Sequence, residues 1–189
     1  MTPVDVTSEF CAHVAMNPVN RAILSRWDLL DLPDSWLVAG CLFQTVWNIQ
    51  SGRSPDAGIK DYDIFYFDPG DLSESAEAQV QARMASLLGD LGVVIEVANQ
   101  ARVHQWYPKH FGQPYPALTS AADGIRRFLV LETCVGVRPN GCIAPYGLTG
   151  LYEGTLTSNP LMPYATLFRQ KVASYCQRWD GLRIQEGHR

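Results

Sequence analysis

Two aspartates separated by one residue form the part of this sequence best suited to chemistry. Asp61 and Asp63 belong to residues 61–67, where aromatic and β-branched side chains predict a strand. Because side chains two positions apart on a strand share a face, both carboxylates point to the same side. Such a pair repels itself and resists desolvation, and a divalent cation between the two carboxylates removes both penalties. The alternative interpretation is that this end of the strand is open to water and the aspartates are solvated.

A third acid, Glu96, lies in residues 93–98, a second predicted strand in which its neighbours are apolar. A carboxylate among apolar residues needs a partner, because burying it alone is costly. One possible partner is a salt bridge with Arg102 or Arg83. The other is a site shared with the two aspartates, since three carboxylates provide the hard oxygen ligands that suit Mg²⁺ or Mn²⁺. Ions held in this way can activate an attacking oxygen and stabilise a leaving pyrophosphate.

A glycine stands where a strand is expected to run into a helix. Residues 36–39 predict a short buried strand, Gly40 interrupts it, and helical periodicity follows over residues 41–50. The free amides at a helix start bind phosphate, and a glycine there lets the phosphate approach the backbone. A glycine at such a turn is commonly no more than a tight turn. Here, however, it precedes the aspartate pair by one helix and one loop.

Taken in this order, the glycine turn and the three acids resemble the nucleotidyltransferase superfamily of the polymerase-beta type. More closely, the chain is similar to a bacterial nucleotidyltransferase-like family whose substrate is unassigned. The segments that carry the resemblance span residues 17–179 and comprise residues 45–47, 61–68, 71–73, 99–104, 106–107, 135–138 and 144–148. The run Asn-Gln-Ala-Arg-Val-His at residues 99–104 is the most specific of them.

The resemblance implies an α/β (α+β) fold, with a small mixed sheet backed by helices and with a hairpin and a helix near the C-terminus. It also implies roles for individual residues. Gly40 and Cys41 would contact the triphosphate of an NTP, and Asp61 and Asp63 would bind the metal ions. Glu96 would be the third acid, which helps to deprotonate a hydroxyl of the acceptor.

Two features depart from the superfamily pattern. The residue after the glycine is usually serine, whereas this chain has Cys41, a weaker hydrogen-bond donor. The loop before Asp61 is also longer than in compact members. A catalytically inactive module that still binds a nucleotide or metal is therefore kept as an alternative. A metal-dependent nuclease ranks last, because the Lys expected two residues after the strand acid is replaced by Ala98.

Arg102 has two interpretations. Its guanidinium matches phosphate oxygens, so it is a candidate nucleotide-binding residue. It could equally form a structural ion pair with Glu96 or an aspartate. Residues 99–113 are expected to be a polar, extended segment on which Arg102 and His104 alternate and face the site together.

The remaining elements follow from periodicity and capping. Ser73 is expected to cap a long helix, since its hydroxyl can accept a hydrogen bond from the first turn. The other predicted elements are a helix from residues 17–18 to about residue 32, a helix from residue 119 or 120, a hairpin formed by residues 133–138 and 142–144, and a helix over residues 162–179.

Composition limits the classes of function. The 189 residues carry a net charge of −4 and are 47% hydrophobic, which predicts one domain spanning residues 1–189 with a sizeable core. No apolar stretch approaches the length of a membrane helix, and no secretory signal is visible. The five cysteines form no CxxC pair, so reduced thiols and a cytoplasmic location are expected.

These observations predict a metal-dependent nucleotidyltransferase that uses Mg²⁺ or Mn²⁺ to move a nucleotidyl group from an NTP to a hydroxyl. The acidic balance and the lack of a basic stripe favour a small-molecule or protein acceptor over a long nucleic acid.

Overall fold

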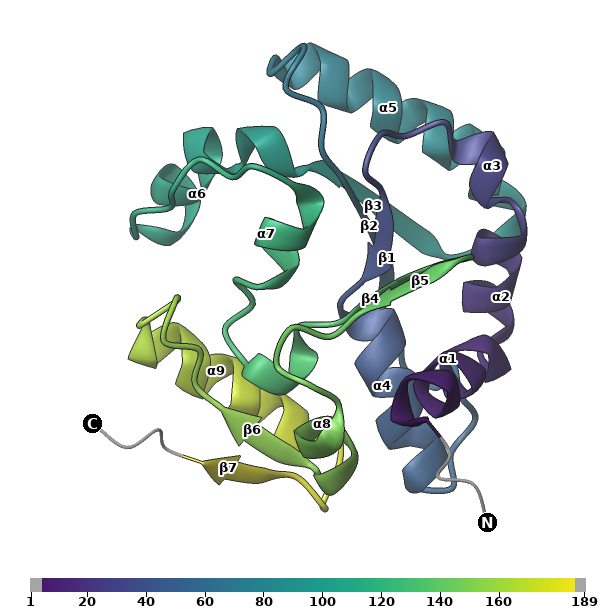
Figure 1. Ribbon diagram of the computed structural model, residues 1–189, viewed down its shortest axis with the longest axis vertical. Coiled ribbons are helices and arrows are strands. Elements are labelled where there is room, and N and C mark those ends of the chain that lie inside the picture. The colour runs from purple at the N-terminus through teal and green to yellow at the C-terminus, as the bar shows by residue number, and fades with distance from the viewer. Residues whose placement is uncertain (1–4, 186–189) are drawn as a thin grey trace.

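A five-stranded mixed sheet organises the molecule in the computed structural model, which describes residues 5–185 (Figure 1). The strand order is β3-β2-β1-β4-β5, and only the β2–β3 pair is parallel among these strands. The bounds are β1 Trp36–Val38, β2 Asp61–Tyr66, β3 Val94–Asn99, β4 Gly136–Arg138 and β5 Gly141–Ile143. The expected α/β fold with a mixed sheet is confirmed, as is the hairpin, now β4 and β5.

One face of the sheet packs on the helices of the first half of the chain. These are α1 Val6–Met16, α2 Pro18–Ser25, α3 Trp27–Leu30, α4 Gly40–Gln50 and α5 Glu74–Leu88, which is followed by the 3-10 turn η1 Gly89–Leu91. The inward side chains of β2, Tyr62, Ile64 and Tyr66, join the main hydrophobic core on this face. The opposite face of β2 is only partly covered, because Asp61, Asp63 and Phe65 are each half-buried.

The predicted capping of α5 is confirmed. The hydroxyl of Ser73 accepts a hydrogen bond from the amide of Ala76 at 3.2 Å. The helix expected to run to about residue 32 is instead divided at Arg26 into α2 and α3. Its predicted start is correct, since the side chain of Asn17 caps α2 and Pro18 occupies the first turn.

The segment over residues 99–113 is helical, which corrects the expectation of an extended chain. It consists of the 3-10 turn η2 Gln100–Arg102 and the helix α6 Val103–Phe111. The buried side chain of Asn99 accepts a hydrogen bond from the amide of Ala101 and so ends β3 and begins the turn. Arg102 and His104 consequently do not alternate on one face as strand residues would.

The last third of the chain covers the partly exposed face of the sheet. Its elements are α7 Ala121–Ile125, η3 Leu131–Thr133, α8 Thr149–Glu153, β6 Thr155–Thr157, α9 Ala165–Cys176 and β7 Arg183–Gln185. Strands β6 and β7 form a separate parallel pair. The helix α9 packs on α4 through edge-to-face contacts of Tyr175 with Phe43 and Trp47, whose ring centroids lie 5.4 Å from that of Tyr175. Helix α1, helix α8 and the β6–β7 pair had no counterpart among the predicted elements.

All five cysteines are free thiols, as the sequence predicts. Within residues 5–185, none of the helices combines the length and apolar character that crossing a membrane requires.

Candidate active site

The three acids project from the same face of the sheet. Alternation along β2 directs Tyr62 and Ile64 into the core, so Asp61 and Asp63 point to the opposite side. The parallel register pairs Asp63 with Glu96 on β3. All three carboxylates line a cavity of about 650 Å³.

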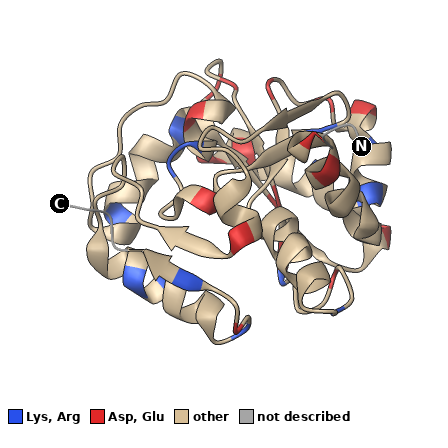
Figure 2. Cartoon of the chain, turned by 60° about the horizontal axis from the view of Figure 1, so that its bottom comes forward, with Lys and Arg blue, Asp and Glu red and all other residues tan. Residues whose placement is uncertain are grey.

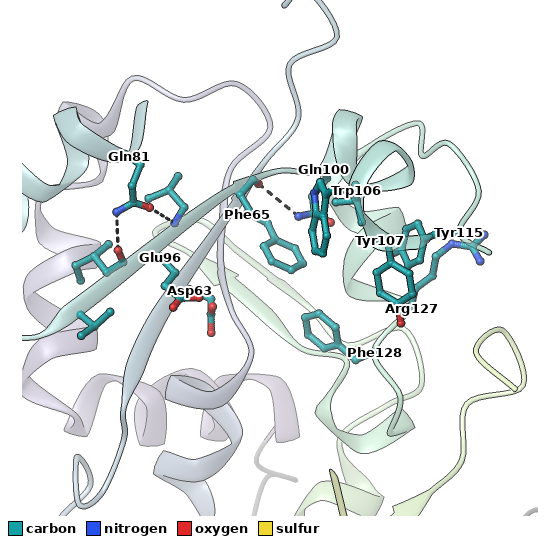
Figure 3. A pocket seen from close by; sticks show the side chains of 16 residues that line it. Asp63, Phe65, Gln81, Glu96, Gln100, Trp106, Tyr107, Tyr115, Arg127 and Phe128 are labelled. Atoms are coloured by element: carbon teal, nitrogen blue, oxygen red, sulfur yellow. Dashed lines mark hydrogen bonds between the residues drawn. The ribbon is translucent and has the colours of Figure 1, made fainter. Parts of the chain in front are cut away.

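Glu96 is held in place by its strand rather than by a partner of its own. The side chain of Gln81 on α5 donates to the carbonyl of Ile95 and accepts from the amide of Val97, both at 2.8 Å. These two bonds satisfy the outer edge of β3 on either side of Glu96 (Figure 3). The expectation of a buried, paired Glu96 is wrong, because this side chain is exposed and no salt bridge to Arg102 or Arg83 forms among residues 5–185.

Negative charge accumulates around Asp63. Burial, and after it the neighbouring charges of Asp61 and Glu96, together raise the pKa of Asp63 to about 7. Lys171 on α9 acts in the opposite direction and lowers the pKa. The carboxylates are therefore only partly compensated by the cation that the protein supplies.

The residues present fit a divalent cation in chemistry, although they do not form a finished set of ligands. Within residues 5–185, no three His, Cys, Asp or Glu side chains converge as a group able to hold an ion. The donors available are nevertheless hard carboxylate oxygens, which Mg²⁺ and Mn²⁺ prefer. Burial first, and then the charges of Asp61 and Glu96, disfavour the ionised form of Asp63, and a bound cation would offset both effects.

Helix α4 begins at the wall of this cavity. No side chain caps its N-terminus, and Ala39 before it has φ 60° and ψ −137°, a strained conformation for a residue with a Cβ. A Cβ on Gly40 would lie 2.5 Å from Nε2 of Gln44 and 4.0 Å from Oδ1 of Asp61. The glycine thus lets the start of the helix, the Gln44 amide and the first aspartate share one small space.

Cys41 does not present its thiol to the cavity. Its side chain is fully buried and donates a hydrogen bond to the carbonyl of Val38 at 3.2 Å. Burial raises the pKa of this thiol well above its usual value, an effect increased by Asp63. Any contact of Cys41 with a triphosphate would therefore be made by its backbone amide at the start of α4 and not by its thiol.

Arg102 is also not brought to the site. Its guanidinium forms an ion pair with Glu77 of α5, and its Nε donates to the carbonyl of Leu72 at 3.2 Å. Glu74 lies further away, with 3.7 Å between the charged atoms. Only 7% of the Arg102 side chain is exposed. Arg102 does form a structural ion pair, as one of the two interpretations predicts. Its partner, however, lies on α5 and is not one of the three acids, because Arg102 follows η2 toward that helix.

Three polar side chains in the cavity were missed or given little weight by sequence reasoning. Lys171 and Gln44 line it from α9 and α4, and Arg127 lines it from the loop after α7. Within residues 5–185, Nε of Arg127 and Oε1 of Gln44 are buried and have no hydrogen-bond partner. No local motif marks them, since each approaches the acids only through the tertiary fold.

A second cavity of about 660 Å³ adjoins the first and has aromatic walls. Asp63, Glu96, Phe65, Phe128, Tyr107 and Arg127 line both cavities. We call the one with Gly40 the glycine cavity and the other the aromatic cavity. In Figure 3 the rings of Phe65 and Phe128 lie between the carboxylates and the Tyr107–Tyr115 pair, and the two phenylalanine centroids are 5.6 Å apart.

The comparisons with known proteins agree with this geometry. A family model described as a nucleotidyltransferase matches residues 25–184. The chain belongs to this nucleotidyltransferase family. An NMR structure whose description states that it reveals a CCA-adding enzyme head domain is similar over 95% of each chain, with 24% sequence identity and a TM-score of 0.77. At that identity the likeness shows a common fold. No curated protein matches the chain at a significant level. Family and fold together support nucleotidyl transfer in general terms.

Proposed function

We propose that this protein is a metal-dependent nucleotidyltransferase that moves a nucleotidyl group from an NTP to a hydroxyl of a small-molecule acceptor. The observation that carries the proposal is the glycine cavity, in which the carboxylates of Asp61, Asp63 and Glu96 meet the uncapped start of α4. Membership of the nucleotidyltransferase family supports the same reaction class.

The triphosphate binds at the start of α4 in this proposal. Backbone amides of the first helical turn donate to phosphate oxygens, and Gly40 leaves room for close approach. The Gln44 amide, whose Oε1 has no partner among the described residues, lies beside that turn and donates through Nε2. Lys171 faces the same space from α9 and supplies positive charge.

The reaction is an in-line transfer at the α-phosphorus. The oxygen of the acceptor hydroxyl forms the new bond to phosphorus, and the bond to the bridging oxygen breaks, which releases pyrophosphate. The carboxylate of Glu96, which is exposed and unpaired among the described residues, accepts the hydroxyl proton. Asp61 and Asp63 would hold Mg²⁺ or Mn²⁺, which when bound neutralises the carboxylates and stabilises the charge that develops on the leaving group.

The acceptor is proposed to be small rather than a long nucleic acid. The net charge is −4, and Figure 2 shows both acidic and basic residues distributed along the chain. A chain that neutralises many phosphates needs clustered cations. The five free thiols fit a cytoplasmic location, which we propose as well.

Transfer is tested with α-³²P-labelled NTPs, Mg²⁺ or Mn²⁺, and a metabolite extract as the source of acceptors, with mass spectrometry to identify the adduct. The expected result is a labelled product that disappears in Asp63→Asn. The matched control is Asp28→Asn, which changes an exposed aspartate of α3 and should leave transfer intact. Absence of any product with all four NTPs and both metals would contradict the proposal.

The second candidate is a module of the same fold that binds a nucleotide without transferring it. The burial of the Cys41 thiol favours it, because the side chain after Gly40 then contributes no donor to the phosphates. Calorimetric binding of an NTP with no labelled product in the same assay would support this candidate over the first.

A further inference from the structure

The residues that line only one of the two cavities differ in chemical character. Beyond the shared residues, the glycine cavity has the start of α4, Gln44 and Lys171. The aromatic cavity instead has Trp106, Tyr115 and apolar side chains such as Val103. The start of α4, Gln44 and Lys171 thus line only the glycine cavity and Trp106 and Tyr115 only the aromatic cavity, although apolar side chains contribute to both.

The aromatic cavity is built around rings that contact one another at tilted angles. The centroids of Tyr107 and Tyr115 are 4.4 Å apart, and those of Trp106 and Tyr107 are 5.9 Å apart. Phe65 and Phe128 line the part of the cavity nearest the carboxylates of Asp63 and Glu96, which also border it (Figure 3). Such surfaces hold planar rings better than sugars or flexible chains, and a volume of about 660 Å³ is that of a small-molecule site.

A free cation marks the other end of the aromatic cavity. Figure 3 shows Arg127 beside Tyr115, on the far side of Phe65 and Phe128 from Asp63 and Glu96. Within residues 5–185, Arg127 forms no salt bridge, and its buried Nε has no hydrogen-bond partner. An unpaired guanidinium next to aromatic rings is suited to an anionic group of a bound ligand.

From this arrangement we infer that the aromatic cavity is the acceptor site and takes a small aromatic alcohol with an anionic group at the opposite end. The ring lies among Trp106, Tyr107 and Tyr115, the hydroxyl reaches Glu96, and the carboxylate or phosphate of the ligand meets Arg127. This inference rests on the proposed function, because it names the acceptor class of the same reaction.

Binding of three probes to the full chain tests the inference. The probes are 4-(hydroxymethyl)benzoate, benzyl alcohol, which lacks the anion, and trans-4-(hydroxymethyl)cyclohexanecarboxylate, which lacks the aromatic ring. We expect the benzoate to quench tryptophan fluorescence and to bind about tenfold more tightly than the cyclohexane analogue and at least threefold more tightly than benzyl alcohol. Trp106→Phe keeps a ring at that position and should abolish the quenching while leaving calorimetric binding of the benzoate within about threefold.

Nucleotide binding supplies the control for the assignment of the two cavities. Trp106→Ala should weaken the benzoate about tenfold and change the calorimetric affinity for each NTP with Mg²⁺ less than twofold. Lys171→Ala, in the glycine cavity, should instead weaken NTP binding about tenfold and change the affinity for the benzoate less than twofold. Equal binding of all three probes, or loss of NTP affinity in Trp106→Ala, would overturn the inference and leave the proposed function intact. Probe binding by a chain that binds no NTP would instead defeat the proposed function.

Discussion

Replacing Asp63 with asparagine should stabilise the metal-free protein at neutral and alkaline pH. The side chain is half-buried, and its pKa is raised to about 7 by burial and by the charges of Asp61 and Glu96. Asparagine keeps the shape and removes the charge, so the variant avoids both the desolvation of a carboxylate and its repulsion by two others. The native residue is thus expected to cost stability in return for a function.

The magnitude follows from the two pKa values. An aspartate with a pKa of 3.8 when unfolded and about 7 when folded loses about 4 kcal/mol of stability on ionisation. Partial access to solvent reduces the expected effect to about 2–4 kcal/mol. The folded state binds the proton more tightly, so the penalty is absent below pH 4, grows as the pH rises through 4 to 7, and is constant above that range.

Urea unfolding in EDTA at pH 4 and pH 8 measures the effect. We expect Asp63→Asn to match the native protein at pH 4 and to exceed its free energy of unfolding by about 2–4 kcal/mol at pH 8. Asp28→Asn is the surface control and should change stability by no more than about 0.5 kcal/mol at either pH. A loss of about 3–5 kcal/mol in Asp63→Asn at pH 8 would refute the reasoning, since that is the behaviour of half of a buried ion pair.

Three further substitutions distinguish residues that contribute to the candidate site from residues that only stabilise the fold. Gly40→Ala should lower the NTP affinity measured by calorimetry at least tenfold and change the free energy of unfolding by about 1 kcal/mol or less. The stability change is small because the new Cβ displaces only the end of the Gln44 side chain. Unchanged NTP affinity would show that the start of α4 is not part of the site. Arg102→Ala should lower the free energy of unfolding in urea by about 3 kcal/mol, because it leaves the carboxylate of Glu77 without its partner. A selective loss of NTP affinity in a variant of unchanged stability would instead show that Arg102 binds phosphate. Cys41→Ser should leave transfer within twofold of the native rate, because the side chain at this position is buried, whereas a large gain in the labelled-NTP assay would show that the thiol limits catalysis.

The parts of the fold with a strong local signal could be predicted from the sequence. The alternation of Tyr62, Ile64 and Tyr66 with the aspartates fixed the faces of β2, and Ser73 marked the start of α5. Residues 99–113 carry an apolar stripe at helical spacing that the prediction of an extended chain did not weigh, formed by Val103, Trp106, Tyr107 and Phe111. Asn99 caps only the short turn η2, and among the described residues no side-chain hydrogen bond caps α6, so no capping signal marks the start of this helix.

In the candidate site, the spacing of the acids along the sequence predicted that they share one face of the sheet. It did not predict which residues surround them. Two positions of separation place Asp61 and Asp63 together in any strand, and the register with Glu96 follows once β2 and β3 are parallel neighbours. The approach of Lys171 and Arg127 depends on how the last third of the chain folds over the sheet, which no short-range pattern encodes. The orientation of Arg102 toward Glu77 on α5 depends on how β3 and η2 pack beside that helix, which the spacing of the residues does not reveal.

One wall of the glycine cavity is formed by α9, which lies near the C-terminal end of the described residues. Asp63 and Lys171 face one another across the cavity although about a hundred residues separate them along the polypeptide. During synthesis, the acidic sheet therefore leaves the ribosome well before α9, the element that tempers its charge. A chain that ended before α9 would lack Lys171 and with it one wall of the glycine cavity.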